Sequence, residues 1–374
     1  MKDFISGHYI NQGYCKSFQP AYINRQFKMD DMEVIQLLSQ ADRELGRLDM
    51  YSKYIPDIDL FIRMHVIKEA ARSSRIEGTQ TSVSEALWDR EDIPPDRRDD
   101  WEEVQNYIKA MEWAIDNLES LPFSNRLIRE THRILLKDAR GKEKSPGNFR
   151  TSQNWIGGVS LNDAIYIPPV HNTVQELMSD LEKFLHNKKI FLPELIRIGI
   201  AHYQFETIHP FLDGNGRVGR LMIPLFLVSA VILHRPVLYL SDFFERNRKL
   251  YYDNLMIVRD ENNLGQWLKF FLTGIIETSG NGISTFDNIL QLQMTVERKI
   301  HTLGSRAAKA KKIIDYLYKK PIINAEIVSR NAGISMPSSY KLIKDLESLE
   351  VLTEVTGGQR SRMYIFRDYL NLFN

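Results

Sequence analysis

Apolar residues recur at helical spacing along most of this chain of 374 residues, and the periodicity predicts a mainly α-helical protein. Residues 1–27 lack a regular pattern and predict an irregular arm. The second helical pattern ends at Gly78, a residue type that often terminates helices. The helices that we expect lie at residues 30–48, 61–76, two within 100–137, 174–185, 194–207, 218–233, 243–258 and 263–277, and a polar helix follows at 286–303 after a weak break at 279–282.

The helical pattern gives way at two places. Within residues 145–169, short apolar segments alternate with turn residues such as Gly157 and Gly158, which predicts a β-hairpin at 151–169. Beyond residue 304, three short helices at 306–319, 324–332 and 336–349 precede two strand patterns at 351–355 and 362–366. This order is typical of a winged helix-turn-helix. We therefore divide the chain into an N-terminal helical region (1–100), a core (101–280), a linker helix (281–304) and a winged-helix domain (305–374).

Composition excludes several classes of protein. A hydrophobic content of 43% with 26% charged residues fits a soluble globular protein, and the net charge of +1 gives no overall attraction to nucleic acid or membrane. The longest apolar run, 221–233, is too short to span a bilayer, and the N-terminus lacks the apolar run of a signal peptide. Cys15 is the single cysteine, so no disulfide can form within the chain. We therefore expect a cytoplasmic protein without a membrane partner.

The chemistry concentrates in residues 209–220, His-Pro-Phe-Leu-Asp-Gly-Asn-Gly-Arg-Val-Gly-Arg. A Gly-Asn-Gly turn just before a helix predicts an anion site suited to phosphates. Arg217 and Arg220 share one face of the first helical turn and can bind further phosphate oxygens. Asp213 is the kind of ligand that Mg²⁺ takes beside substrate phosphates, and His209 can accept a proton from a hydroxyl. The alternative is a structural glycine-rich turn, but the complete set at fixed spacing favours the functional interpretation.

This stretch resembles the signature of the Fic family, His-x-Phe-x-(Asp/Glu)-Gly-Asn-Gly-Arg-x-x-Arg, at every fixed position. The resemblance implies a Fic-type helical core that transfers AMP from ATP, with Mg²⁺, to a Ser, Thr or Tyr hydroxyl of a protein, with release of pyrophosphate. The kinase branch of the superfamily, Doc, carries Lys where this chain has Gly216, so nucleotidyl transfer is favoured over phosphorylation.

The resemblance also assigns roles along the motif. It implies that His209 is the general base, that Asp213 is the Mg²⁺ ligand, and that Arg217 and Arg220 hold the β- and γ-phosphates. The residues that we expect to contact the nucleotide are Gly214, Asn215, Gly216, Arg217, Val218, Gly219, Arg220, Tyr252 and Glu77. Tyr252 enters with Tyr251 and Asn254 because their family position borders the adenosine, although tyrosines at helical spacing often serve packing.

A second motif lies upstream, where Ser73-Ser74-Arg75-Ile76-Glu77-Gly78 resembles the family's inhibitory motif, (Ser/Thr)-x-x-x-Glu-(Gly/Asn). Ser73 and Glu77 share a helix face, and a carboxylate in the last turn favours a cation partner because it faces the negative end of the helix dipole. The resemblance implies that this partner is Arg220, so that pairing removes Arg220 from ATP and inhibits the enzyme. The alternative is an exposed glutamate before a capping glycine. Reverse, de-AMPylating activity is left open.

Partners are suggested by the hairpin and by the C-terminal residues. The hairpin at 151–169 resembles the family's target-positioning flap, whose edge can pair with a segment of the target, unless it is purely structural. Residues 305–374 carry 12 Lys/Arg against 7 Asp/Glu, a net charge of +5. Both DNA binding and protein docking or dimerisation fit this domain. The side chains that would read DNA are Ser338, Ser339, Tyr340, Lys341 and Lys344 on the third helix, with Arg360 and Arg362 at the wing.

We thus expect a protein substrate, with the protein itself, DNA and a homodimer as further candidate partners. The rival functions are a nucleotide-sensing DNA-binding regulator, a de-AMPylase, and an enzyme that transfers another group such as UMP or phosphocholine.

Overall fold

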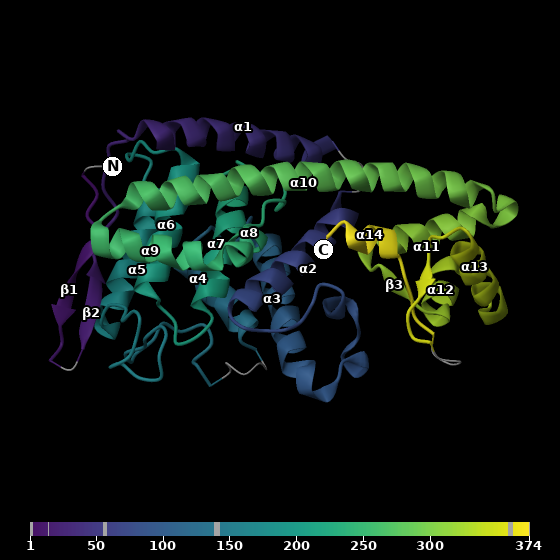
Figure 1. Ribbon diagram of the computed structural model, residues 1–374, viewed down its shortest axis with the longest axis horizontal. Coiled ribbons are helices and arrows are strands. Elements are labelled where there is room, and N and C mark those ends of the chain that lie inside the picture. Colours follow the sequence, from purple (N-terminus) through teal and green to yellow (C-terminus); the bar gives the residue numbers. More distant parts are fainter. Residues whose placement is uncertain (1–2, 14, 55–57, 138–142, 358–361, 374) are drawn as a thin grey trace.

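A computed structural model describes residues 3–13, 15–54, 58–137, 143–357 and 362–373. The molecule is elongated and helical, and two long helices, α1 (Met32–Tyr54) and α10 (Leu264–His301), run side by side along one face (Figure 1). They are parallel, because Lys269 pairs with Glu33 near their starts and the Tyr51 hydroxyl donates to Asp287 further along. At 1.5 Å per residue, α10 is about 57 Å long and reaches from the core to the C-terminal elements.

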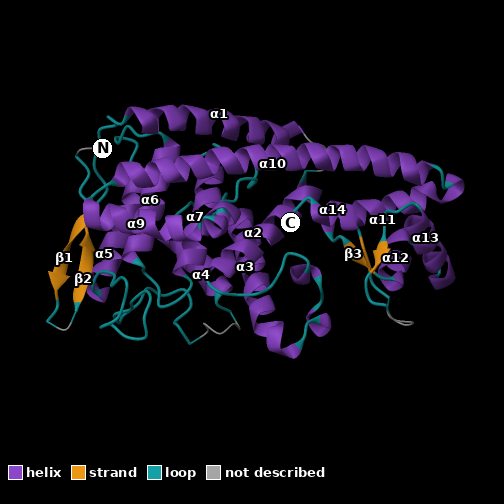
Figure 2. Ribbon diagram, viewed as in Figure 1, coloured by secondary structure: helices purple, strands orange, loops and turns teal. Residues whose placement is uncertain are grey.

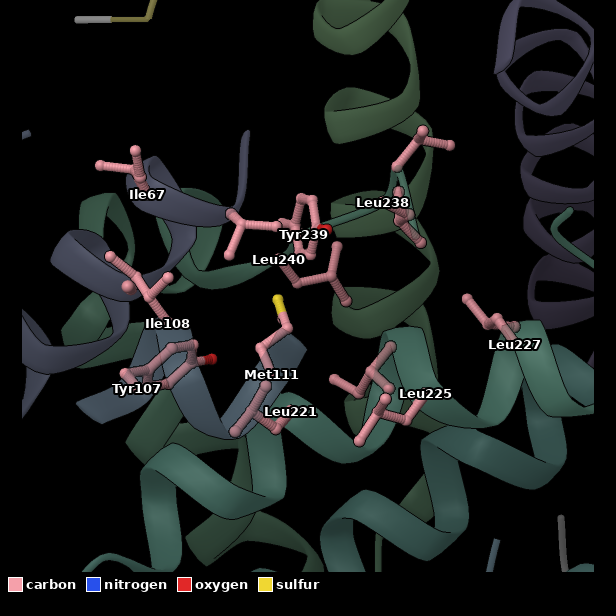
Figure 3. Packing of buried hydrophobic residues seen from close by; sticks show 14 of the residues in the cluster. Ile67, Tyr107, Ile108, Met111, Leu221, Leu225, Leu227, Leu238, Tyr239 and Leu240 are labelled. Atoms are coloured by element: carbon pink, nitrogen blue, oxygen red, sulfur yellow. The ribbon is translucent and has the colours of Figure 1, made fainter. Parts of the chain in front are cut away.

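The remaining helices pack beneath this pair around one continuous apolar core. Figure 3 shows the part of it where Ile67, Tyr107, Met111 and Leu221 meet Leu240. Among the described residues, no helix is both long enough and apolar enough to cross a membrane. The helices between α1 and α10 are α2 (Asp59–Ile76), α3 (Arg98–Asn117), α4 (Asn125–Leu135), α5 (Val174–His186), α6 (Glu194–Ile208), α7 (Asn215–Ser229), α8 (Ser241–Arg246) and α9 (Arg248–Glu261), with short 3₁₀ turns at Glu85–Leu87, Arg90–Asp92, Pro95–Arg97 and His171–Thr173. The mainly α-helical prediction is confirmed.

The weak break expected at residues 279–282 is wrong, because α10 continues through it without interruption. Gly282 lies against the side chain of Leu48 on α1, and a Cβ there would come within 3.0 Å of Leu48 Cδ1. Ser279 is completely buried. The small residues therefore allow α1 to approach closely, and this packing overrides the low helix propensity of glycine.

Strands are confined to the two ends of the molecule (Figure 2). The irregular arm predicted for residues 1–27 is wrong in part, since β1 (Gly7–Asn11) and β2 (Lys16–Pro20) form an antiparallel hairpin. Tyr9 and Phe18 pack edge to face across it at 5.1 Å, and the Phe18 N–H donates to the carbonyl of Ile167. The hairpin thus lies beside the segment predicted to be the flap.

The flap segment itself is less regular than predicted. Instead of a hairpin over 151–169, the structure has one isolated antiparallel bridge, between Ile156 and Tyr166. The tip is an irregular loop in which the Asp163 carboxylate accepts hydrogen bonds from the backbone of Val159 and Ser160. These bonds take the place of hydrogen bonds between paired strands. The pairing in this segment therefore does not extend beyond the single bridge.

The C-terminal residues contain the three predicted helices and both predicted wing segments. The helices are α11 (Ala307–Lys319), α12 (Ala325–Ala332) and α13 (Met336–Ser348), and a sheet of order β3-β5-β4 joins β3 (Ile322–Ile323), β4 (Thr353–Glu354) and β5 (Tyr364–Ile365) before α14 (Arg367–Asn371). Strand β3 was not predicted. A turn at Gly304–Arg306 links α10 to α11. Arg360 lies outside the described residues.

Candidate active site

The loop 209–214 connects α6 to α7 and is closed by its own side chains. His209 caps α6 in the left-handed conformation (φ 50°), and Gly214 takes φ 77° just before α7. The Asn215 side chain both accepts from the Phe211 N–H and donates to the Phe211 carbonyl, each at 2.8 Å. Because its amide is used in this way, Asn215 offers its backbone N–H, rather than its side chain, to a ligand at the start of α7.

Two residues that the sequence analysis did not identify, His132 and Arg150, support the backbone of this loop. The His132 ring stacks on Phe211 with centroids 3.7 Å apart. Since the Gly147 N–H donates to His132 Nδ1, the proton lies on Nε2, which donates to the carbonyl of Asp213 at 3.0 Å. Arg150, which is buried, donates through Nε to the carbonyl of His209 at 3.0 Å. The backbone of the loop is therefore fixed independently of any ligand.

His209 is neutral at physiological pH in this environment. Burial lowers its pKa to about 3, and the positive charge of Arg150 acts in the same direction. Its Nδ1 is buried and has no hydrogen-bond partner among the residues that the structure describes. A neutral imidazole is the form that can accept a proton.

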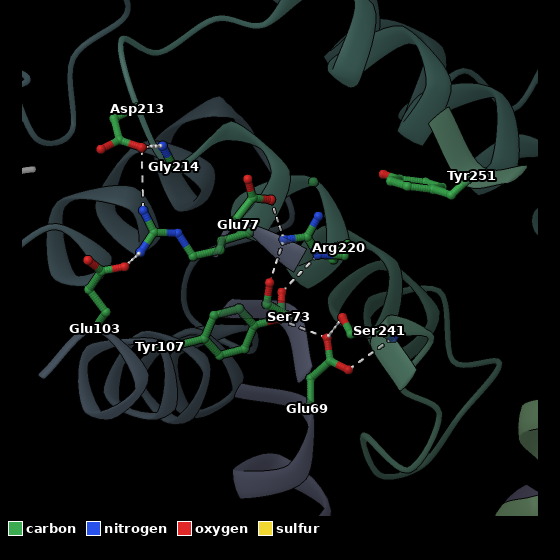
Figure 4. A network of polar contacts seen from close by, with 12 residues as sticks. Glu69, Ser73, Glu77, Glu103, Tyr107, Asp213, Gly214, Arg220, Ser241 and Tyr251 are labelled. Carbon is green, nitrogen blue, oxygen red and sulfur yellow. Dashed lines mark hydrogen bonds and ion pairs between the residues drawn. The ribbon is translucent and has the colours of Figure 1, made fainter. Parts of the chain in front are cut away.

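The predicted pair of Glu77 and Arg220 is present (Figure 4). Arg220 is almost completely buried, and its Nη2 donates to Glu77 Oε1 at 2.6 Å and to the Ser73 carbonyl at 2.9 Å, while its Nε donates to Ser73 Oγ at 2.8 Å. Burial raises the pKa of Glu77, but the charge and the hydrogen bonds of Arg220 outweigh it and lower the pKa overall. All three contacts come from the last turn of α2 and its C-cap residue, Glu77. We call this arrangement the latch.

The Glu77 carboxylate lies directly over the start of α7. A Cβ built on Gly216 would be 2.3 Å from Glu77 Oε1, so the carboxylate packs against the backbone of the first helical turn. A negative charge is favourable at a helix N-terminus, where the first N–H groups have no partner within the helix. Glu77 thus occupies the place where a phosphate would be most favourable.

Arg217 points toward α3 rather than lying free. Its Nη1 donates to Glu103 Oε2 at 3.0 Å and its Nη2 lies 3.4 Å from Asp213 Oδ1. The Asp213 side chain is 44% exposed, and the Gly214 N–H also donates to Oδ1. An exposed carboxylate beside a phosphate-type site fits one Mg²⁺ ligand. No cluster of three metal-binding side chains exists in the part of the chain that the structure describes, so further Mg²⁺ ligands would have to come from nucleotide phosphates.

A buried polar network that the sequence did not reveal continues from the latch along α2. Glu69 Oε1 accepts from the hydroxyls of Tyr107 (2.9 Å) and Ser241 (2.5 Å), and Oε2 accepts from the Ser241 N–H (Figure 4). Burial raises the pKa of Glu69. Glu69, Ser73 and Glu77 are spaced four apart on one face of α2, so this helix is fixed to α3, α7 and α8 along a single line.

Most of the remaining predicted site residues are buried in the core, and Tyr252 is partly exposed. Val218 is buried in the core, and Gly219 packs against Glu206 of α6. Tyr251 is buried, and its hydroxyl donates to His202, whose Nδ1 donates to the Gly219 carbonyl. Tyr252 is 38% exposed near the latch. The nucleotide contacts assigned to Val218, Gly219 and Tyr252 stay predictions.

Glu206 is a further buried acid that the motif does not include. It lies three residues before His209, and its Oε1 has no hydrogen-bond partner among the described atoms. Burial raises the pKa of Glu206 to about 7, and the charge of Arg220 opposes this shift.

Comparisons with known proteins agree with this geometry. The model of the Fic/DOC family N-terminal region matches residues 35–116, and the model of the Fic/DOC family matches residues 122–227. The chain belongs to the Fic/DOC family. The first matched region contains Ser73 and Glu77, and the second contains Arg220 and the loop 209–214.

Curated relatives are named protein adenylyltransferases. The chain is 33% identical over 144 residues to protein adenylyltransferase Fic of Aedes aegypti, which is 38% of this chain and 26% of that protein. It is 29% identical over 166 residues to a probable protein adenylyltransferase of Aquifex aeolicus (strain VF5), which is 42% of this chain and 47% of that protein. The chain thus spans about a quarter of the length of the mosquito relatives.

Solved structures show the same fold. A Fic family protein from Desulfovibrio desulfuricans G20 aligns over 91% of this chain and 98% of its own, with a TM-score of 0.59 and 19% identity. A Fic domain containing signaling protein from Bacteroides thetaiotaomicron VPI-5482 covers 68% of this chain and 97% of its own, with a TM-score of 0.54 and 17% identity. The predicted Fic-type helical fold is confirmed.

Proposed function

We propose that this protein transfers AMP from ATP to a hydroxyl group of a protein, and that Glu77 inhibits the reaction. The observation that carries the proposal is the contact between the two motifs. The carboxylate of Glu77 lies against Gly216 at the start of α7 and pairs with Arg220, in the place that a triphosphate needs. The names of the relatives support the same activity.

The proposed reaction forms one bond to phosphorus, breaks another, and transfers one proton to His209. The target hydroxyl oxygen attacks the α-phosphorus of ATP, and the bond from that phosphorus to the bridging oxygen of the β-phosphate breaks, so that pyrophosphate leaves. His209 accepts the hydroxyl proton, for which its neutral form is suited. The charge of the bound phosphates would raise the pKa of His209 and strengthen it as a base.

The residues around the loop have distinct tasks in this proposal. The free N–H groups of α7 bind phosphate oxygens, and Arg220 turns to them once Glu77 has left. Asp213 would hold Mg²⁺, which when bound neutralises phosphate charge. Arg150 and His132 keep the loop backbone in place through its carbonyl groups.

The test compares ATP labelled at the α-phosphate with ATP labelled at the γ-phosphate, with label followed on the protein and in a cell lysate. We expect label only from the α-position, and a Glu77→Gly variant should transfer roughly 5–150-fold faster, the range of an ordinary coupling energy. Adding His209→Ala should lower the rate by roughly 10²–10⁴-fold. Glu261→Gly is the matched control, because it removes an exposed carboxylate from the end of another helix, α9.

Two results would contradict the proposal. Label from the γ-position would mean phosphorylation and a reversed nucleotide. Equal transfer by wild type, Glu77→Gly and Glu261→Gly would remove the inhibitory role of the latch while leaving the transferase in place.

A second candidate function, DNA binding, rests on the surface of α13. Ser338, Tyr340, Lys341 and Lys344 are exposed there, and the order of elements from α11 to β5 supports the winged-helix interpretation. Ser339 does not belong to this surface, since it is buried and donates to the Ser335 carbonyl. Salt-dependent binding of duplex DNA that weakens in a Lys341→Ala/Lys344→Ala variant would support this function. Absence of binding at low salt would count against it.

A further inference from the structure

A cavity of about 310 Å³ lies outside the proposed active site, where the C-terminal elements meet α2 and α3. Its walls come from four segments that are far apart in sequence. Those segments are α2, the residues 86–91, α3 and the end of α11. A volume of this size is within the range of small-molecule sites.

The inner wall of the cavity is apolar and aromatic. Ile67, Leu87 and Ile108 are buried, and the two indole rings of Trp88 and Trp101 are partly exposed beside them. Flat aromatic side chains in a partly open cavity favour a ligand with a ring system of its own, since stacked rings gain energy beyond the area that they bury.

The charged residues that line the cavity differ in their ion-pair partners. Lys320 pairs with Asp89 and Arg90 pairs with Glu102, which neutralises these charges locally. Two further lining cations, Arg63 and Lys319, are exposed, although Arg63 also interacts electrostatically with Glu112 and the lining includes a second acid, Glu91. The cavity therefore has positive charge to offer on both the α2 side and the α11 side.

One donor in the lining is also unused. Trp101 Nε1 is buried and has no hydrogen-bond partner within the described part of the chain. Buried donors are rarely left without an acceptor, because the loss of hydration is then uncompensated. A ligand that supplies an oxygen acceptor would satisfy it.

We propose that this cavity is a binding site for a small aromatic anion. The ring system stacks with Trp88 and Trp101, the acidic group is held by Arg63 and Lys319, and an acceptor oxygen receives the Trp101 N–H. This site does not rest on the proposed transfer of AMP. Because its walls belong both to α2 and to α11, its ligand would bridge the helix that carries Glu77 and the C-terminal elements.

The proposal is tested with two dyes that share one ring system and differ in charge. 1-Anilinonaphthalene-8-sulfonate carries a sulfonate, and N-phenyl-1-naphthylamine lacks it. Calorimetric titration of the full chain should give one saturable site for the sulfonate and roughly tenfold weaker binding of the neutral dye, as expected for a charge-assisted contact.

Variants assign the binding to the cavity. Arg63→Ser/Lys319→Ser should weaken binding of the sulfonate by roughly tenfold, and Trp101→Phe, which keeps an aromatic ring of smaller size but removes the donor, by a few-fold. Arg43→Ser/Lys312→Ser removes two exposed cations elsewhere and should leave the affinity unchanged. All of these positions are at least partly exposed, and matching thermal midpoints would show that folding is intact.

Three outcomes would overturn the proposal. They are the absence of saturable binding to wild type, equal affinity for the two dyes, and an affinity that Arg63→Ser/Lys319→Ser leaves unchanged. Because the experiment measures dye binding, a negative result would not contradict the proposed transfer of AMP.

Discussion

The two ends of α2 are held by different kinds of contact. At its C-terminal end, Ser73 and Glu77 make three hydrogen bonds to the single guanidinium of Arg220. Near its N-terminal end, Phe61 packs edge to face on Tyr318 at 5.4 Å, and the His65 ring lies 5.1 Å from that of Phe373. We call this second contact, between α2 and the C-terminal elements, the clamp.

The difference indicates a division of tasks along one helix. Buried edge-to-face aromatic rings stabilise by the area that they remove from water and by their ring contacts. The latch consists of directional polar bonds, and the Glu77 side chain is 34% exposed, so water and phosphate can replace it. We therefore expect changes at the clamp to alter stability without altering AMP transfer, and changes at the latch to do the reverse.

The largest expected effect is on stability, from Phe61→Ala at the clamp. Phe61 is 1% exposed, and truncation of a buried phenylalanine costs about 3–5 kcal/mol. Urea unfolding measures this loss. Phe191→Ala is the matched control, since Phe191 is 83% exposed and its loss should change stability by less than about 0.5 kcal/mol. A rise in AMP transfer by folded Phe61→Ala would show that the clamp also controls the latch.

The next largest effect is the pH dependence of folding stability that Glu206 causes. This residue lies near Arg220 of the latch. Its pKa rises from an ordinary 4.5 to about 7 on folding, chiefly through burial, so the folded protein retains the proton. The resulting stability is fully present below the unfolded pKa and is lost as the pH rises through the folded one, a total of about 3 kcal/mol. A Glu206→Gln variant stays neutral and should not lose it.

The measurement compares the free energy of unfolding of Glu206→Gln and wild type at two pH values. At about pH 5 the two should differ little, and at about pH 8 the variant should be more stable by about 3 kcal/mol. Other groups titrate equally in both proteins, so the difference isolates Glu206. A constant difference across this range would mean that Glu206 ionises normally in the folded protein.

The sequence was sufficient to predict features that residues close together along the chain determine. Helical periodicity located most of the main helices, although it divided α10 in two and joined α8 and α9 into one helix at 243–258. The motif from His209 to Arg220 located the loop between α6 and α7. The ion pair of Glu77 with Arg220 joins residues 143 positions apart, and it was predicted only because two short motifs resemble those of one family. Its geometry over Gly216 came from the structure.

Contacts that no local pattern encodes were missed. His132 and Arg150 support the loop from other elements, and Glu103 pairs with Arg217 across 114 positions, although each appears in the sequence as an ordinary polar residue. The expected break near Gly282 failed for the same reason. Helix propensity is a local property, whereas the approach of Leu48 to that glycine is set by tertiary packing.

The smallest effect that we expect separates the hydrogen bonds of the latch from its charge. Ser73→Ala removes the Oγ that accepts from Arg220 Nε at 2.8 Å but leaves the Ser73 carbonyl and Glu77 in place. A hydrogen bond of this kind contributes about 1 kcal/mol, so AMP transfer should rise by roughly fivefold, well below the effect of Glu77→Gly.

The neighbouring serine provides the control for this substitution. Ser74 is equally buried, yet its Oγ has no hydrogen-bond partner among the described residues, so Ser74→Ala should leave transfer unchanged. Initial rates with α-labelled ATP measure both variants. If Ser74→Ala raised transfer as much as Ser73→Ala, the effect would come from a general loosening of α2. If AMP transfer rose only in Ser73→Ala, the hydrogen bond from Arg220 to the Ser73 hydroxyl would itself limit the rate.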